Sequence, residues 1–355
     1  MTTRWLSESI APERNSFNLV RLLAAIGVIV SHAFLIPNGV GSQEPLQQLT
    51  GLTLGQHAVH VFFVISGLTL ARSLELSSSM VRYAVSRFLR IVPALVGFGV
   101  IFAFIVGPIV SKSPWEEYFL NEKTWQYPFL VWLQFQNTPP PPRIFESVPI
   151  AGAVNNPLWT IKYEIFAYVG LGLFAVGRLF QKMTVLVGTL VALAALTIAL
   201  QPYELNHSLG PLFQAAKFGT CFMLGVVAYF LKQFIPAKAI WLAVSLLIAV
   251  AFSNSNFAIL PFILLDAHFA LIVGSHDYGA LSAWTRVNDV SYGAYIYGWP
   301  THQSLVAIFP GIGMFSGGAL TLIIVLTVGL LSWRAIEKPA LLLKPSARVT
   351  RDSAW

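Results

Sequence analysis

Apolar residues recur along this chain in runs of about 20, and short polar stretches separate the runs. A helix of that length can cross a hydrocarbon core about 30 Å thick. The runs are too continuous for membrane-barrel strands, which alternate apolar and polar residues. We therefore expect an all-α, polytopic transmembrane bundle of about ten helices. The expected spans are residues 17–37, 55–74, 91–111, 157–177, 183–201, 211–231, 239–254, 257–275, 289–309 and 315–333.

Lysine and arginine residues fall mostly on one side of this expected topology. With the N-terminus inside, seventeen lie on the cytoplasmic side, and only Lys112, Lys123 and Arg143 lie outside. Cytoplasmic loops collect positive charge during insertion, so both termini are expected in the cytoplasm. We expect one membrane domain over residues 1–345, a short cytoplasmic tail over 346–355, and a multi-pass location in the inner (plasma) membrane. The first span lacks the features of a cleaved signal peptide and is expected to be retained.

Composition agrees with lipid as the main environment. Hydrophobic residues make up 56% of the 355 residues and charged residues only 10%, whereas soluble proteins carry about 25% charged residues. The net charge of +7 comes from scattered basic residues, so nucleic acid is not an expected partner. The single cysteine, Cys221, is expected to be a small packing residue. Lipid-facing and subunit-facing apolar surfaces look alike in sequence, which leaves the oligomeric state open.

Arg21 and His32 are ionisable residues inside the first span, and such residues are the first candidates for chemistry. They are eleven residues apart, which places them on one helical face about 16 Å apart along the axis. Arg21 would lie near the cytoplasmic mouth, where a guanidinium suits a phosphate-bearing donor. His32 would lie deeper, where an imidazole can take a proton from a hydroxyl. A positive-inside anchor and a hydrogen-bonded core histidine explain the same spacing equally well.

The second span contains two histidines near its outer end. Its sequence GQHAVHVFFVISGLTL places His57 and His60 at the entrance and Ser66 and Gly67 deep inside. The histidines are candidates for chemistry or core packing. Small residues inside a span are better explained by close helix packing than by chemistry.

The fourth span opens with NNPLWTIKYEIFAY, which contains a polar stripe. Asn156, Thr160, Glu164 and Tyr168 recur every four residues and so share one helical face. Glu164 is expected to face the protein interior at about the depth of His32. There a carboxylate can orient an imidazolium, bind an acceptor hydroxyl or pair with a cation.

Two further features leave alternatives open. Arg87 and Arg90, at the cytoplasmic start of the third span, share a helical face and suit either the phosphates of a nucleotide donor or ordinary inside anchoring. The longest loop, about residues 112–156, is expected outside and carries four tryptophan and tyrosine residues between positions 115 and 127. They indicate an interfacial belt or re-entrant segment, or else a sugar-stacking surface over the site. These residues are Trp115, Tyr118, Trp125 and Tyr127.

Six motifs in this order resemble the acyltransferase type 3 family of membrane O-acyltransferases, several of which modify lipopolysaccharide O-antigens and exopolysaccharides. The motifs cover most of the chain and read FNLVRLLAAIGVIVSHAF, GQHAVHVFFVISGLTLARS, RFLRIVP, NNPLWTIKYEIFAY, SYGAYIYGWP and WRAIEKP. The resemblance implies a ten-helix core and an acyl-CoA donor, usually acetyl-CoA, on the cytoplasmic side. It also implies acyl transfer to a hydroxyl of an extracytoplasmic carbohydrate or glycolipid.

The resemblance also assigns roles to residues. His32 is the implied catalytic residue, and Arg21, Arg87 and Arg90 serve the donor. The polar stripe, and not the resemblance, adds Glu164 as a second catalytic candidate, which would raise the basicity of a histidine or hold the acceptor. The predicted substrate-binding residues are His57, His60, Asn156, Trp159 and Tyr163. No metal is expected.

Two positions depart from the family pattern. Asn18 stands where many members have an aspartate three residues before the arginine, so Arg21 lacks a charged partner there. Gly298 stands where many members have a histidine, which places more weight on His32.

The expected mechanism leaves the role of His32 open. It acts either as a general base on the acceptor hydroxyl or as a transient acyl carrier. The alternatives to an enzyme are a transporter or flippase of a lipid-linked sugar, and a sensor that binds acyl-CoA without consuming it. The acceptor and the acyl length are not distinguished by these motifs.

Overall fold

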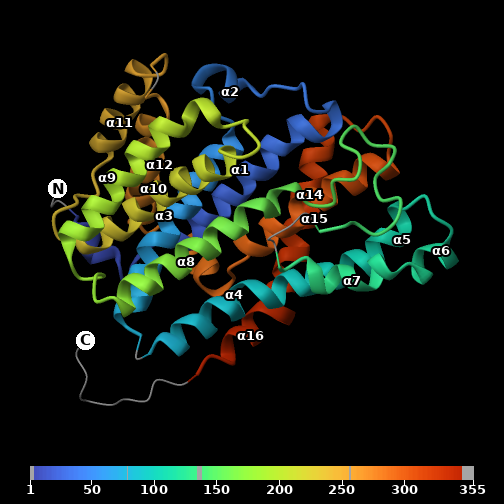
Figure 1. Cartoon of the computed structure of the whole chain (residues 1–355), viewed down its shortest axis with the longest axis horizontal. Helices are drawn as coiled ribbons and strands as arrows, with labels where there is room; N and C mark the ends of the chain where they lie inside the picture. The colour runs from blue at the N-terminus through green and yellow to red at the C-terminus, as the bar shows by residue number, and fades with distance from the viewer. Residues whose placement is uncertain (1–3, 78, 134–137, 256, 346–355) are drawn as a thin grey trace.

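The computed structural model describes residues 4–345, apart from residues 78, 134–137 and 256. The predicted tail, residues 346–355, lies outside this part of the chain. The described residues form helices and isolated bridges but no named strand, which confirms the all-α prediction (Figure 1). The longer helices are α1 (Phe17–Asn38), α3 (Leu54–Glu75), α4 (Met80–Ile101), α8 (Ile161–Val176), α9 (Met183–Leu200), α10 (Gly210–Phe230), α11 (Ala239–Ala251), α12 (Ile259–Gly274), α14 (Ser291–Ile308) and α15 (Met314–Ser332).

Shorter helices connect or extend these elements. A π-helical turn, η3, extends α4, and another, η6, extends α15, while the 3-10 helix η4 leads directly into α8. The α-helical pieces are α2 (Pro45–Thr50), α5 (Gly107–Val110), α6 (Trp115–Leu120), α7 (Glu122–Leu130), α13 (Ala280–Val287) and α16 (Lys338–Leu342). The others are η1 (Leu6–Ser9), η2 (Pro12–Arg14), η3 (Phe102–Val106), η4 (Asn156–Thr160), η5 (Gln201–Tyr203) and η6 (Trp333–Glu337).

Seven helical stretches of the described chain are long and apolar enough to cross a membrane. They are Phe17–Asn38, Leu54–Glu75, Met80–Val110, Asn156–Val176, Met183–Tyr203, Gly210–Phe230 and Met314–Leu342. The other three expected spans form helices of 13, 16 and 18 residues, α11, α12 and α14. The chain is therefore a multi-pass helical membrane protein. The count of ten spans and the cytoplasmic placement of both termini stay predictions.

The third helix begins eleven residues earlier than its apolar run, at Met80 instead of residue 91. The Ser79 hydroxyl accepts a hydrogen bond from the Arg82 backbone N–H at 3.1 Å and caps this earlier start. A helix begins where its first free N–H groups find acceptors, not where hydropathy rises. Arg87 and Arg90 consequently lie well inside α4.

Helices α3 and α10 form the centre of the bundle and are its most buried spans. They cross at two glycines, which fixes how closely the backbones approach. A Cβ added at Gly67 would lie 2.0 Å from the Phe222 carbonyl oxygen, and one added at Gly225 would lie 2.0 Å from the Val64 carbonyl oxygen. The prediction that Gly67 serves close packing is thereby confirmed.

The long aromatic loop forms the α6 and α7 helices, which gather with α5 at one end of the bundle (Figure 1). Tyr118 and Tyr127 are buried against α4 and η3, whereas Trp115 and Trp125 are exposed. The Tyr118 hydroxyl donates to the Ala103 carbonyl oxygen at 2.9 Å. The tyrosines therefore act as packing residues beneath the loop, and none of these four side chains lines the pockets described next.

Candidate active site

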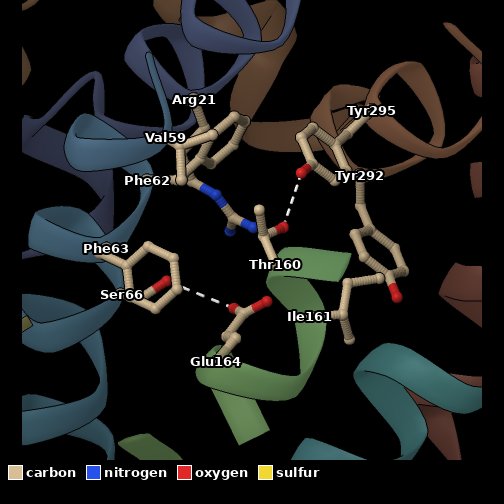
Figure 2. Close-up of a pocket in the computed structure, with 10 residues that line it drawn as sticks. All are labelled: Arg21, Val59, Phe62, Phe63, Ser66, Thr160, Ile161, Glu164, Tyr292 and Tyr295. Carbon is tan, nitrogen blue, oxygen red and sulfur yellow. Dashed lines mark hydrogen bonds between the residues drawn. The ribbon is translucent and has the colours of Figure 1, made fainter. Parts of the chain in front are cut away.

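Two adjoining pockets lie along one side of α1. The Arg21 chamber, which contains the Arg21 and Glu164 side chains, has a volume of about 40 Å³. The His32 chamber has a volume of about 140 Å³. The one-face prediction for Arg21 and His32 is thereby confirmed, because both chambers are bounded by α3 and η4. The Arg21 chamber is lined by Arg21, Val59, Phe62, Phe63, Ser66, Thr160, Ile161, Glu164, Tyr292 and Tyr295 (Figure 2).

Three residues, Val59, Thr160 and Tyr295, line both chambers and form the wall between them. The Tyr295 hydroxyl oxygen lies 2.6 Å from the Thr160 hydroxyl oxygen and 2.8 Å from the Pro157 carbonyl oxygen. Figure 2 shows Arg21 pointing toward Thr160 from one side of this contact. The wall is thus a single layer of side chains between a cationic and an imidazole-containing pocket.

His32 lies in its chamber without a hydrogen-bond partner among the described residues. Its ring packs edge-on against Trp299, with the ring centroids 4.9 Å apart and the planes at 83°. The Trp299 indole is fixed in turn, since its N–H donates to the Ala153 carbonyl oxygen at 2.9 Å. Packing therefore orients the imidazole while leaving its nitrogens free for a ligand hydroxyl.

The helix that carries Trp299 also carries a buried histidine that sequence reasoning missed. A Cβ at Gly298 would lie 2.8 Å from Ile29, so α14 approaches α1 closely there. His302 follows one turn later, is 1% exposed, and has no hydrogen-bond partner for either ring nitrogen among the described residues. It is close enough to His32 for the two rings to interact electrostatically. Its spacing of four residues from Gly298 was the available signal.

Arg21 and Arg90 meet at a carboxylate that the sequence did not identify. Asp289, which precedes α14, accepts a hydrogen bond from Arg90 Nη2 at 2.6 Å, and its Oδ2 lies 3.7 Å from Arg21 Nη1. The Ser291 hydroxyl donates to the other Asp289 oxygen at 2.7 Å. Although Asn18 carries no charge, Arg21 has a charged partner in Asp289, which lies 268 positions later in the sequence. The charged partner that is missing at position 18 is thus supplied from the residues before α14.

Burial by itself would raise the pKa of Asp289. The positive charges of Arg90 and Arg21, with the hydrogen bonds from Ser291 and Arg90, outweigh burial and lower this pKa to about 2. Asp289 is thus ionised at any physiological pH. Its negative charge balances one of the two guanidinium charges. Its contacts with Arg21 and Arg90 also connect α1 with α4.

The WRAIEKP motif contributes a second anion and an aromatic surface to the same cluster. Glu337 Oε2 lies 4.0 Å from Arg90 Nη1, and the Trp333 and Tyr292 rings lie 5.8 Å and 5.6 Å from the Arg90 guanidinium. Arg90 is consequently held by two carboxylates and two rings. Arg90 thus connects α4 with α14 and η6.

Arg87 is less constrained than Arg90. Its guanidinium lies 5.8 Å from the Tyr168 ring, and its Nε, like that of Arg21, is buried without a hydrogen-bond partner among the described residues. Partial burial and repulsion from Arg87, Arg90 and Arg82 lower the pKa of Lys344, which shows that positive potential gathers at this end of the site. Unpaired guanidinium donors in a positive field suit a phosphate-bearing ligand.

Glu164 lines the Arg21 chamber and not the His32 chamber. Its Oε1 accepts hydrogen bonds from the Ser66 hydroxyl at 3.4 Å and from the Tyr168 hydroxyl. The expectation that it lies level with His32 was wrong. Glu164 lies beside Ser66 of α3, whereas the His32 chamber is lined by Gln56, ten residues and about 15 Å earlier on the same helix.

The His32 chamber has polar residues from four other helices, α3, η4, α10 and α14. It is lined by Val28, His32, Thr53, Gly55, Gln56, Val59, Pro157, Trp159, Thr160, Gln214, Lys217, Phe218 and Tyr295. Lys217 is 1% exposed, with its Nζ 3.7 Å from Glu204 Oε1 and about 5 Å from two phenylalanine rings. Sequence reasoning did not include Lys217 or Gln214 among the site residues. The position of Lys217 inside an apolar span was a signal that could have identified it.

The predicted substrate-binding residues divide into two groups. Trp159 lines the His32 chamber, whereas Asn156 is exposed and Tyr163 packs against the Phe218 ring. His57 and His60 also lie outside both chambers and contact Asp266 instead. The polar stripe therefore places only its Thr160 and Glu164 members at a pocket.

Comparison with known proteins agrees with the motifs. The family model described as an acyltransferase domain matches residues 14–334. The O-acetyl transferase of Shigella phage Sf6 is 28% identical over 335 residues, which cover 91% of this chain and 95% of the phage protein. Nodulation protein 10 of Rhizobium leguminosarum bv. viciae is 26% identical over 389 aligned positions, covering 98% of each chain. No solved structure matches.

Proposed function

This chain belongs to the acyltransferase-domain family, and from that membership we propose that it moves an acetyl group from cytoplasmic acetyl-CoA to a hydroxyl of an extracytoplasmic carbohydrate or glycolipid. The proposed location is the inner (plasma) membrane. The observation that carries this proposal is the pair of chambers along α1, one containing Arg21 and the other His32, with a single wall of side chains between them.

The donor side is proposed at the arginine-rich end. Arg21 and Arg87 each have a buried, unpaired Nε, and Lys344 adds to the positive potential there. These groups would bind the phosphates of the CoA moiety, while Arg90 stays paired with Asp289 and positions the helices. Glu164 lies in the same chamber and is proposed to orient the donor through its hydroxyl-bonded carboxylate.

The acceptor side is proposed in the His32 chamber. Trp159 offers a ring face for a sugar, and Gln56, Gln214 and Lys217 offer hydrogen-bond donors. His32 would take the proton from the acceptor hydroxyl while the hydroxyl oxygen attacks the carbonyl carbon of the thioester. The carbon–sulfur bond then breaks, and the sulfur leaves with that proton as the free thiol of CoA. The products are the acetyl ester and CoA.

The test uses purified protein in proteoliposomes of known orientation. Radiolabelled acetyl-CoA is supplied on the cytoplasmic face, and a panel of glycan and glycolipid acceptors on the other. We expect wild type to transfer label to an acceptor and His32→Ala to lose activity by about 10²- to 10⁴-fold, the usual contribution of a general base. Arg21→Ala is expected to raise the KM for acetyl-CoA.

His207→Ala is the matched control, because this exposed histidine lies in the loop before α10, away from both chambers. It is expected to retain wild-type transfer. Wild-type activity in His32→Ala would overturn the assignment of the base. Movement of a sugar or lipid across the bilayer without consumption of acetyl-CoA would replace the enzyme with a transporter.

A further inference from the structure

Two helices outside the chambers bring a third polar cluster together. His57 and His60 lie one turn apart on α3 and face Asp266 on α12. His57 Nδ1 lies 2.9 Å and 3.0 Å from the two Asp266 oxygens, and His60 Nδ1 lies 2.8 Å from Oδ2. All three residues are buried. Neither chamber includes them, so acyl transfer leaves this cluster without a role.

The cluster contains a carboxylate that has no lysine or arginine partner among the described residues. Asp266 is 6% exposed, and its ion-pair partners among the described residues are the two histidines, which carry charge only when protonated. A buried carboxylate normally pairs with a cation or binds a metal. Two neutral imidazoles leave a full negative charge inside the bundle, and a divalent cation would offset it.

We propose that His57, His60 and Asp266 bind one divalent first-row transition cation, such as Zn²⁺, between α3 and α12. Two imidazole nitrogens and a carboxylate oxygen form a donor set typical of these ions. The three donor atoms lie within 4.8 Å of one another. With metal–ligand bonds of about 2.1 Å, nitrogen and oxygen atoms 2.8–3.0 Å apart would subtend about 90° at the cation.

The surroundings of His57 suit a metal ligand. A neutral histidine that binds metal through Nδ1 carries its proton on Nε2, which then needs an acceptor. His57 Nε2 lies 3.3 Å from the Thr50 hydroxyl at the end of α2. The His57 side chain is 11% exposed and that of His60 is fully buried, so a cation would enter past His57.

Such a cation would fix α3 against α12. Helix α3 also supplies Gln56 and Val59 to the His32 chamber. The metal would therefore position that wall without contacting the substrate. Its proposed role is structural. The test consequently reads metal binding and stability and does not depend on transfer activity.

The experiment uses the full chain, purified in detergent, stripped with chelator and titrated with Co²⁺ while visible absorption is recorded. We expect ligand-field bands that saturate at one Co²⁺ per chain, compete with Zn²⁺, and disappear in His60→Ala and Asp266→Asn. His207→Ala and His268→Ala are matched controls and should keep the bands, since neither histidine belongs to the cluster. No bands in the wild type, or equal bands in His60→Ala, would overturn the site.

Two measurements avoid dependence on variants that fail to fold. Thr50→Val keeps all three ligands and removes the hydroxyl beside His57, so its Co²⁺ affinity should fall by about 10- to 100-fold. Added Zn²⁺ should raise the melting temperature of stripped wild type with increasing concentration, because it binds the folded chain. A melting temperature that stays constant up to millimolar Zn²⁺ would contradict the proposal.

Discussion

Arg21 and Arg90 approach one carboxylate from two different helices. This contact shows how single residues organise the arginine-rich end of the site. Asp289 lies 2.6 Å from Arg90 Nη2 and 3.7 Å from Arg21 Nη1, while Glu337 lies 4.0 Å from Arg90 Nη1. A buried ion pair contributes little net stability when intact, but removal of one partner leaves an uncompensated charge. The cluster is therefore more sensitive to single substitutions than to paired ones.

Replacing Arg90 alone should be strongly destabilising. We expect Arg90→Ala to lower the free energy of unfolding by about 3–5 kcal/mol, because Asp289 loses its nearest partner. The double variant Arg90→Met with Asp289→Asn should recover only part of this loss, because it removes the Asp289 charge but leaves Arg21 and Glu337 without their ion-pair partners. Denaturant unfolding in detergent measures both effects. Arg143→Ala, which breaks the exposed pair with Glu146, should leave stability unchanged, and equal losses in both arginine variants would contradict the argument.

The lowered pKa of Asp289 predicts that the stability of the folded chain depends on pH. Its folded pKa is about 2, below the ordinary value of 3.8, so the folded state favours the carboxylate. The resulting stabilisation is fully present above about pH 4 and is lost as pH falls toward 2. The difference in melting temperature between wild type and Asp289→Asn should therefore narrow between pH 4 and pH 2. A constant difference over this range would argue against a lowered pKa.

At the scale of elements, the crossing of α3 and α10 sets the position of both chambers. Gly67 and Gly225 allow backbone contact there, and α3 then presents Val59 and Ser66 to the pockets. An outward movement of α3 would carry Val59 away from Thr160 and open the wall between the chambers. Small residues thus act at a distance from the chemistry by fixing the helix that lines it.

A methyl group at this crossing should therefore be costly. Gly225→Ala places a Cβ 2.0 Å from the Val64 carbonyl oxygen, and we expect a loss of about 1–3 kcal/mol in unfolding free energy. Gly188→Ala in α9 is the matched control, because a Cβ there meets nothing within 4 Å. Its higher helix propensity should stabilise by about 0.5–1 kcal/mol. Thermal unfolding compares the two, and similar effects at both sites would refute a tight crossing.

Val59 tests whether the acyl group crosses the wall between the chambers. Val59→Trp should block the passage and abolish transfer while acetyl-CoA binding is retained, whereas Val59→Ala should keep transfer within about 10-fold, since its smaller side chain opens the wall. Equilibrium binding and transfer assays on the same preparation separate the two steps. Normal transfer by a folded Val59→Trp variant would show that the route lies elsewhere.

At the scale of the whole molecule, lysine and arginine residues are expected to gather on one side of the helical bundle. The proposed reaction requires the Arg21 chamber to face the cytoplasm, and the lysine and arginine distribution predicts that orientation. The loop after α9 should then lie outside, and the loop after α10 inside. Both loops are described and have exposed positions at His207 and Gln233.

Cysteine labelling tests this orientation directly. In a Cys221→Ala background, His207→Cys should react with a membrane-impermeant maleimide in sealed right-side-out vesicles. Gln233→Cys should react only after the vesicles are permeabilised. The wild-type thiol of Cys221 is buried, so its removal should not disturb either surface. The opposite labelling pattern would reverse the topology and place the arginine cluster on the wrong side for a cytoplasmic donor.

Most of the architecture was predictable because lipid imposes a simple rule on sequence. Backbone groups in a bilayer are satisfied within helices, so each apolar run marks one helix, and α1 and α3 begin within one residue of their expected positions. The start of α4 was not predictable, because the Ser79 cap and not hydropathy determines it. The position of the aromatic side chains in the long loop was not predictable either, because the same residue types occur in buried and in interfacial positions.

The sequence by itself determined the helical bundle, the family motifs and the shared face of Arg21 and His32, because each depends on local periodicity or on residues close together in the chain. Only the tertiary structure decided that Asp289 pairs with Arg21, that Glu164 belongs to the Arg21 chamber, and that His57 and His60 meet Asp266. The ion pairs join positions that are 206 to 268 residues apart, and Glu164 lies 143 positions from Arg21 in the sequence. Helix packing, which no local pattern encodes, brings them together.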